Sequence, residues 1–507
     1  MKLISYDLGT GGVKASLYDQ NLITLSKIFF EYPTYYPDHF MHEQRPADWW
    51  QGISESTKVL LEKAKTSPDE IGIIAISGHS LVVVPIDNKG LPLLEQVPIW
   101  SDTRAVKEAD SFFETIDRNT WYLATGNGFP PPCYSLFKLM WYKKHMPEMF
   151  EKIDKVLGSK DYINYLLTGN IYTDYSYASG TGAYDLLAKC MRRDFLEAAG
   201  ISPSIFPEIV PSHYIVGTVT EQAAKYAGLC PGIPVACGGV DNACMALGAI
   251  GTESGKIYAS LGSSSWVPVN SDKPVLDAVK KPYVFAHIDE RMYTSAFSIF
   301  AGGSSLRWVR DILCSDISGP GAYDRMSELA ALSPLGANGV VFNPSLAGGT
   351  SQDKSVNIHG AFIGLKLGTR REDIIRAAME GIALNLKMSV DNLRGLTYVS
   401  KDILFCGGGS KSDFWMQIFA DVFDMNIIKT NIDQDAASVG VAAICARAAG
   451  IWYDYSGISR LHKVEKVFRP DQVNVAKYSR LYVVFSHICD VAADLGDYME
   501  AAYNEIS

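Results

Sequence analysis

Hydrophobic and polar residues alternate at the start of the chain, over residues 3–19. Ile4, Tyr6 and Leu8 form the hydrophobic set of a first strand, glycines follow at positions 9, 11 and 12, and a second alternating run returns. This pattern predicts a β-hairpin whose glycine-rich turn leaves backbone N–H groups open to a phosphate. Asp7 ends the first strand, where a carboxylate can hold Mg²⁺ through water. An ordinary hairpin with a solvated aspartate fits the same pattern.

Two landmarks of the first half return in the second half. Residues 256–269 again alternate into a Leu-Gly turn, and Ser263 follows that turn as Thr10 follows the first one. Residues 231–251 and residues 433–451 each place an aspartate before a helix of small residues. The repetition predicts that one structural unit occurs twice.

A duplicated α/β architecture accounts for these repeats. The chain has 507 residues, which is too long for a single hydrophobic core. We therefore expect an N-terminal domain over residues 1–250 and a C-terminal domain over residues 251–507. Two similar domains that face each other leave a cleft between them, and this cleft is the expected site.

Composition and charge narrow the classes of partner. The net charge is −10 and Lys and Arg do not cluster, which argues against a nucleic-acid surface. No hydrophobic run approaches the length of a membrane span, and the start of the chain lacks the features of a signal peptide. Nine cysteines without CxxC spacing fit reduced thiols. We expect a cytoplasmic protein that binds neither nucleic acid nor membrane.

Several polar residues are predicted to line the cleft. Asp241 stands at the C-terminal end of a strand, where α/β folds place ligands, although a helix-capping role is the alternative. His79 lies in a turn between two buried strands, which predicts a position at the mouth of a site. Trp100, Asp102 and Arg104 alternate, so they share one face if the segment is extended, and that face suits a polyhydroxy ligand. A salt bridge between Asp102 and Arg104 is the alternative.

A glycine-rich turn lies in the second half. Residues 403–423 read as a buried strand, three glycines and a helix. The glycines allow a nucleotide base or ribose to approach the backbone closely. Neither the Walker pattern nor GxGxxG is present. A turn without a ligand is the alternative.

Taken together, these motifs resemble those of the FGGY carbohydrate kinases, a family of the actin-like ATPase superfamily. DLGTGGVK and SLGSSS are similar to the two phosphate loops, CGGVDNA to the catalytic-base motif, and CYSLFKLMW and GGGSKSDFWMQIFADV to the two signature segments. Their order along the chain agrees as well, which makes the likeness specific. Within the family, residues 125–181 are most similar to xylulokinases.

The resemblance implies two RNase H-like domains with an interdomain catalytic cleft that binds ATP, Mg²⁺ and a sugar. It makes Asp241 the catalytic base and Asp7 the aspartate linked to Mg²⁺. The implied contacts are Thr10, Gly11, Gly12, Gly262 and Ser263 for phosphate, Gly408, Gly409 and Ser410 for adenosine, and His79, Trp100, Asp102 and Asn242 for the sugar. The expected reaction phosphorylates a ketose, with D-xylulose first and another ketose or a polyol as the alternative. The sequence leaves the oligomeric state open, with a homodimer as one possibility.

The sequence departs from the xylulokinase pattern at two places. Xylulokinases usually have Gln-Met-His where this chain has His79, Ser80 and Leu81, and a leucine forms no hydrogen bond to a sugar. Gly349 and Thr350 stand where Glu-Arg is common. The expected activity class is unaffected, but the identity of the sugar stays open. We expect His79 to compensate, because imidazole both donates and accepts hydrogen bonds.

A different class remains as the second hypothesis. Nucleotide-switched proteins of the actin or Hsp70 type share paired phosphate hairpins but need no base that faces a sugar. The set Trp100, Asp102, Arg104 and Asp241 favours the kinase. An increase in ADP release on addition of ketoses would distinguish the two.

Overall fold

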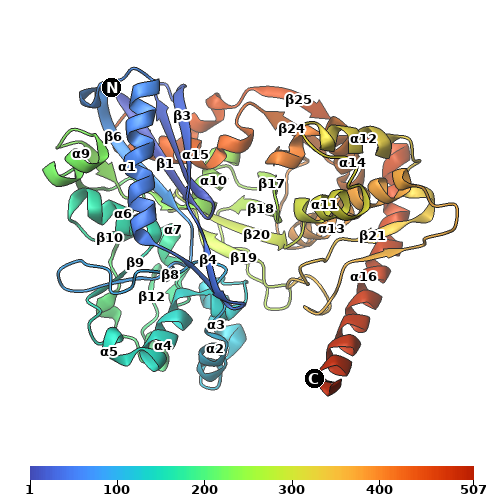
Figure 1. Cartoon of the computed structure of the whole chain (residues 1–507), viewed down its shortest axis with the longest axis horizontal. Helices are drawn as coiled ribbons and strands as arrows, with labels where there is room; N and C mark the ends of the chain where they lie inside the picture. Colours follow the sequence, from blue (N-terminus) through green and yellow to red (C-terminus); the bar gives the residue numbers. More distant parts are fainter. Residues whose placement is uncertain (507) are drawn as a thin grey trace.

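The computed structural model describes residues 1–506, with side chains to residue 503. It has two lobes, each built around a seven-stranded sheet (Figure 1). The first sheet has the order β14-β15-β6-β1-β2-β3, with β16 paired to β6. Its strands are β1 (Lys2–Gly9), β2 (Gly12–Tyr18), β3 (Thr24–Glu31), β6 (Ile71–Gly78), β14 (Ile215–Thr218), β15 (Pro234–Ala236) and β16 (Gly239–Val240).

The second sheet repeats the central pairing of the first. Its order is β19-β20-β18-β17-β23-β24-β25. In each sheet an antiparallel hairpin, β1–β2 or β17–β18, is joined along its first strand to a parallel neighbour, β6 or β23. The strands are β17 (Ile257–Leu261), β18 (Ser265–Ser271), β19 (Tyr283–Ala286), β20 (Tyr293–Ile299), β23 (Asp402–Cys406), β24 (Asn426–Thr430) and β25 (Val464–Phe468). The predicted duplication of α/β structure and both predicted hairpins are confirmed.

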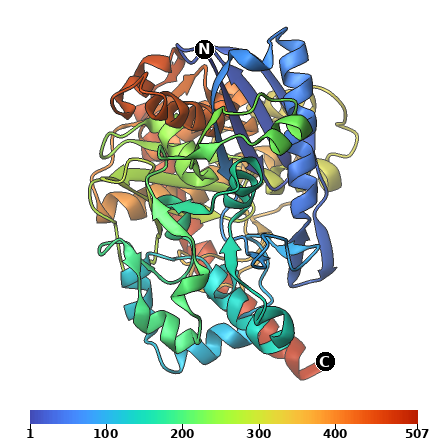
Figure 2. The same cartoon turned by 90° about the vertical axis from the view of Figure 1, so that its left-hand side faces the viewer.

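Helices cover the outer faces of the two sheets. Figure 2 shows α1 (Pro46–Lys63) running along the first lobe. The other helices of this lobe are α2 (Val106–Phe113), α3 (Arg118–Thr125), α4 (Ser135–His145), α5 (Pro147–Phe150), α6 (Ser159–Thr168), α7 (Tyr175–Ala178), α8 (Arg193–Ala199) and α9 (Glu221–Ala227). The short strands are β4 (Tyr35–Asp38), β5 (Met41–Gln44), β7 (Val84–Ile86), β8 (Val97–Pro98), β9 (Lys155–Leu157), β10 (Tyr172–Asp174), β11 (Tyr184–Asp185), β12 (Cys190–Met191) and β13 (Glu208–Val210).

The second lobe contains the two longest helices, α13 (Arg371–Leu396) and α16 (Gln472–Ile506). Its other elements are the helices α11 (Gly303–Trp308), α12 (Ala322–Ala331) and α14 (Asp413–Phe423) and the short strands β21 (Val341–Asn343) and β22 (Ala361–Ile363). The end of α16 projects beyond the body of the lobe (Figure 1). No helix within residues 1–506 combines the length and hydrophobicity that crossing a bilayer requires.

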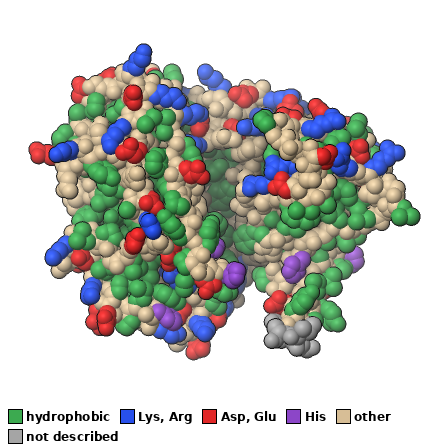
Figure 3. Space-filling model, in the orientation of Figure 1, with side chains coloured by type: hydrophobic (Ala, Val, Ile, Leu, Met, Phe, Trp, Pro, Cys, Tyr) green, Lys and Arg blue, Asp and Glu red, His purple; other side chains and the backbone are tan. Residues whose placement is uncertain are grey.

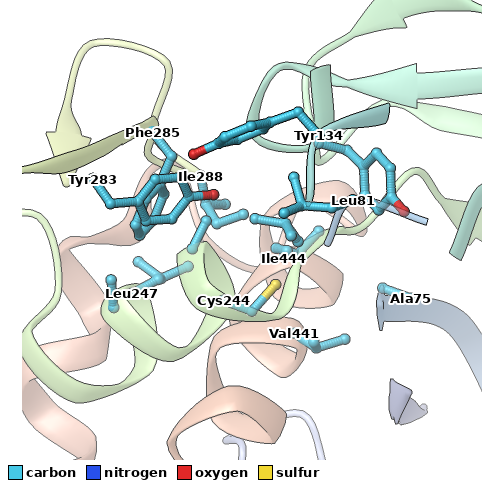
Figure 4. Packing of buried hydrophobic residues seen from close by; sticks show 14 of the residues in the cluster. Ala75, Leu81, Tyr134, Cys244, Leu247, Tyr283, Phe285, Ile288, Val441 and Ile444 are labelled. Carbon is cyan, nitrogen blue, oxygen red and sulfur yellow. The ribbon is translucent and has the colours of Figure 1, made fainter. Parts of the chain in front are cut away.

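Two helices of small residues pack against each other between the sheets. They are α10 (Asp241–Ile250) and α15 (Ala436–Ala448), whose side chains meet in Figure 4. A Cβ atom on Gly248 would lie 1.8 Å from the Ala436 carbonyl oxygen, so glycine is required for this approach. α15 belongs to the second half of the chain, yet it packs on β1 and β6 of the first sheet. The division at residue 250 remains a prediction, and this helix crosses it.

Candidate active site

The turn of the first hairpin is held by hydrogen bonds on one side and is open on the other. The Tyr32 hydroxyl donates to the Gly9 carbonyl, and Gln44 Nε2 donates to the Thr10 carbonyl at 2.6 Å. A Cβ atom on Gly11 would have no neighbouring atom within 4 Å, so the outer face of this residue is free. Gly12 instead has a φ of +156°, and a Cβ there would lie 2.3 Å from the Phe30 carbonyl oxygen. The turn therefore presents open backbone on a rigid support, as a phosphate site requires.

The second hairpin turns against the start of α11. The N–H of Gly303 donates to the Gly262 carbonyl at 2.8 Å, and the N–H of Ser304 donates to the Ser263 carbonyl at 3.0 Å. Arg307 donates to Ser263 Oγ at 3.1 Å, which places a cation beside the turn. The sequence motif did not include Arg307, because its position depends on a helix 44 residues further on.

A cavity of about 530 Å³ adjoins the second hairpin. Gly262, Ser263, Gly408 and Gly409 line it, together with Tyr323, Met379 and Trp415. Its volume falls in the range of small-molecule sites, and its mixture of glycine backbone and hydrophobic side chains suits a nucleoside. Ser410 does not line the cavity: its buried hydroxyl donates to Asp433, which also accepts from the N–H of Gly407. Ser410 thus supports the glycine-rich turn from within.

Two carboxyl groups face the space between the hairpins. Burial raises the pKa of Asp241 from 3.8 to about 7, and the charge of nearby Asp7 contributes to the rise. Burial also raises the pKa of Asp7, which accepts a hydrogen bond from Ser77 Oγ at 2.6 Å. A carboxylate with a pKa near neutrality is suited to accept a proton from a hydroxyl. A divalent cation beside Asp7 would favour the charged form of both groups.

The residues expected at the sugar face are not all exposed there. Trp100 is 38% exposed, and its Nε1 donates to Thr10 Oγ1 at 3.0 Å, which links the sugar side to the phosphate turn. Asp102 is completely buried and pairs with Arg104 at 2.7 Å. The expectation of a common exposed face is wrong, because the segment turns and the alternative salt bridge forms. Asn242 follows Asp241 and is partly exposed.

His79 is completely buried, so the expectation that it stands at the mouth of the site is wrong. Its ring is completely buried and packs edge-on against Trp49 of α1. Its Nδ1 lies 3.1 Å from the Leu8 carbonyl oxygen, and burial lowers its pKa to about 4, so the ring is neutral at pH 7. Sugar binding by His79 remains a prediction, and it requires movement of the ring.

Sequence reasoning missed Lys138, although it is part of the segment KLMW. This lysine is completely buried, and its ammonium group donates to the carbonyls of Leu81 at 2.9 Å and Ile99 at 2.6 Å. Leu81 has a φ of +62°, a strained conformation for a leucine. The hydrogen bond from Lys138 to the Leu81 carbonyl helps to hold this residue in its left-handed conformation.

The two lobes face each other across a hollow that is visible in Figure 3. Each lobe contributes one hairpin turn, the helix α10 that begins with Asp241 contacts strands of both hairpins, and burial raises the pKa of Asp241 to about 7. This arrangement supports transfer of a phosphoryl group to a hydroxyl, which is the chemistry of a small-molecule kinase. Residues 2–248 match the N-terminal domain of the FGGY family of carbohydrate kinases, and residues 257–449 match its C-terminal domain. The chain belongs to this family, and ATP is the phosphate donor.

Relatives support the same assignment. A xylulose kinase from Bacillus subtilis is 30% identical over 500 residues, with 97% of each chain covered. The crystal structure of a xylulose kinase from Rhodospirillum rubrum has a TM-score of 0.89 and 28% identity, and covers 98% of this chain and 100% of its own. A gluconokinase from Bacillus subtilis is 26% identical over 494 residues, with 96% of this chain and 95% of the relative covered. The similarity to these proteins therefore shows that the chain is a sugar kinase, but it does not identify the sugar.

Proposed function

We propose that the protein transfers the γ-phosphate of ATP to a hydroxyl of a ketose, with D-xylulose as the preferred substrate. The observation that carries the proposal is the position of Asp241, which lies beside Asp7 at the start of α10, a helix that contacts strands of both hairpins. Asp241 accepts the proton of the sugar hydroxyl as the new P–O bond forms. Backbone N–H groups of the turns at Gly11 and Ser263 orient the phosphates.

Mg²⁺ bound near Asp7 would neutralise phosphate charge. In kinases one or two carboxylates and the substrate phosphates usually hold Mg²⁺, and Asp7 would supply such a carboxylate here. Closure of the two lobes excludes water, which would otherwise compete with the sugar as acceptor.

A neutral ketose suits the sugar side better than an aldonate. Arg104 is paired with Asp102 and Glu43, and Lys138 is completely buried on two carbonyls, so neither of these cations is free to bind a substrate carboxylate. Leu81 adds an apolar surface where related kinases have a polar contact. An unpaired sugar hydroxyl there costs roughly 1–3 kcal/mol, which alters preference between sugars by about tenfold to a hundredfold.

A coupled assay of ADP release tests the substrate directly. D-xylulose, D-ribulose, D-gluconate and glycerol are compared at equal concentration, and we expect D-xylulose to give the highest kcat/KM. A higher value for gluconate or glycerol would reject the choice of sugar and leave the kinase activity intact. ADP release that no sugar increases would instead favour the nucleotide-switched class.

We also propose that the protein is a cytoplasmic homodimer. Its nine cysteines are free, as in a reducing compartment. Val484, Val491, Leu495 and Tyr498 form an exposed stripe on α16, with spacings of seven, four and three residues that suit pairing with the same helix of a second copy. Light scattering tests this: Leu495→Glu should convert a dimer to a monomer, and a monomeric parent protein would reject it.

A further inference from the structure

A cluster of buried polar side chains lies behind the segment that carries Asp241. At its centre Lys160 is completely buried and forms ion pairs with Asp161 at 2.5 Å and with Asp174 at 3.1 Å. Burial opposes the charge of Lys160, but the two carboxylates together outweigh it and raise its pKa well above the usual value. Buried ion pairs contribute little net stability, because desolvation offsets their attraction. Stabilisation of the fold therefore does not explain this cluster, which points to another role.

One chain of hydrogen bonds leads from this cluster to the catalytic segment. Ser176 Oγ donates to Asp174 Oδ2 at 2.5 Å, and Ser212 Oγ donates to the same oxygen at 2.8 Å. Ser176 Oγ in turn accepts the N–H of Val240 at 2.9 Å. Val240 directly precedes Asp241, so a single hydroxyl connects the cluster to the backbone of the base.

The catalytic segment has little freedom of its own. Asn164 Nδ2 donates to the Cys237 carbonyl at 2.8 Å. Gly238 has a φ of +75°, and a Cβ atom there would lie 1.9 Å from the Ile76 carbonyl oxygen. Gly239 is similarly enclosed. Its surroundings therefore set the position of this segment.

The same cluster reaches the turn on the sugar side. Ser159 Oγ and the Tyr177 hydroxyl both donate to the His79 carbonyl, at 3.1 Å and 3.2 Å. A Cβ atom on Gly78 would lie 2.5 Å from Ser159 Oγ, so the turn rests directly on α6. Both the turn that precedes Leu81 and the segment that carries the base are thus attached to one buried support.

We propose that this cluster fixes the position of the catalytic base relative to the turn of residues 78–81. Ser176 is the positioning residue, because its hydroxyl connects the cluster to the residue before Asp241. The inference rests on the proposed role of Asp241 as base. Without the Ser176 hydroxyl, the N–H of Val240 loses its acceptor, and the residue before Asp241 loses its hydrogen bond to the cluster. A displacement of about 1 Å in an in-line transfer lowers the rate by up to roughly a hundredfold.

A matched pair of variants tests the inference. Ser176→Ala and Ser212→Ala each remove one hydroxyl that donates to Asp174 Oδ2. Only Ser176 also accepts from the catalytic segment through its side chain, because Ser212 contacts Gly238 through its backbone carbonyl, which alanine keeps. We expect similar Tm values for the two variants. Ser176→Ala should lower kcat about tenfold or more with KM for ATP within about twofold, while Ser212→Ala keeps kcat within about twofold.

Two further variants make each outcome decisive. Equal kcat values for Ser176→Ala and Ser212→Ala would overturn the positioning role. If Ser176→Ala does not fold, Ser176→Cys replaces it, because a thiol is close in size to a hydroxyl and a weak hydrogen-bond acceptor. A reduced kcat of Ser176→Cys at unchanged Tm supports the inference, and an unchanged kcat overturns it. Asp241→Asn is assayed in parallel. If the Asp241→Asn protein is active, Asp241 is not the base. If it is inactive while Ser176→Ala and Ser212→Ala have equal kcat values, only the positioning role of Ser176 is rejected.

Discussion

Replacing Asp241 by asparagine should make the protein more stable and much less active. The rise of its pKa from 3.8 to about 7 corresponds to roughly 4 kcal/mol against the charged carboxylate. The side chain is partly exposed, so solvent screening reduces this to about 2–3 kcal/mol. Asparagine keeps the shape and removes the charge. We also expect kcat to fall by about a hundredfold, as for loss of a general base.

The stability gain should depend on pH. In the unfolded chain the carboxyl group ionises near pH 4, whereas in the folded protein it ionises near pH 7. The folded state is therefore penalised progressively as pH rises from 4 to 7, and the full penalty is present above pH 7. Asp241→Asn should accordingly gain little near pH 4 and the full amount at pH 8.

Thermal and urea unfolding at both pH values measure this effect, without nucleotide or Mg²⁺. Asp110→Asn serves as the control, because Asp110 is an exposed partner of Arg118 and should change the stability by less than about 0.5 kcal/mol at either pH. A gain for Asp241→Asn that is the same at pH 4 and pH 8 would refute the electrostatic reasoning. Unchanged kcat would refute the role as base.

Two further predictions concern glycines. Gly11→Val should leave Tm within about 2 °C, because the surroundings of Gly11 are open and no positive φ is required, and it should raise KM for ATP or lower kcat at least about tenfold. Gly12→Val should instead unfold the hairpin, because the new side chain would collide with the Phe30 carbonyl. An equal loss of Tm for both variants would contradict this reasoning. Gly248→Ala should destabilise by about 2 kcal/mol or more, and the control Gly395→Ala, in an exposed part of α13, should stabilise by about 0.5–1 kcal/mol in the same unfolding assay. Similar effects at the two positions would show that the α10–α15 contact can relax.

The two hairpins and the helix that follows Gly239 could be predicted from the sequence, because they depend on residues that are close together in the chain. The alternation around Ile4 and Tyr258 specified both hairpins, since pairing between adjacent strands needs only a turn. Phosphate binding at the glycines and serines of those turns stays a prediction. The Asp-headed helix after Gly239 was also correct, although Asp241 is the first helical residue rather than the cap.

Long-range packing explains what the sequence did not reveal. His79 is buried because Trp49, from a helix 30 residues earlier, covers it. Asp102 is held by Arg104, which also reaches Glu43 across 61 residues. No short window of sequence contains His79 with Trp49 or Arg104 with Glu43, whereas the pairing of Asp102 with Arg104 was the alternative that the sequence itself offered. The same limitation hid the attachment of α15 to the first sheet, since β1 and α15 lie more than 400 residues apart.

That attachment has a consequence for synthesis on the ribosome. The strands β1 and β6 and the helix α10 emerge early, but α15, which covers one face of their sheet, begins about 190 residues after the end of α10. Translation of that interval takes roughly 10–40 s at 5–20 residues per second. Throughout it, the part of this face that α15 covers, which includes Leu3 and Ala75, lacks that helix. The first lobe can therefore complete its core only after α15 has been synthesised, and we expect its exposed apolar surface to bind chaperones until then.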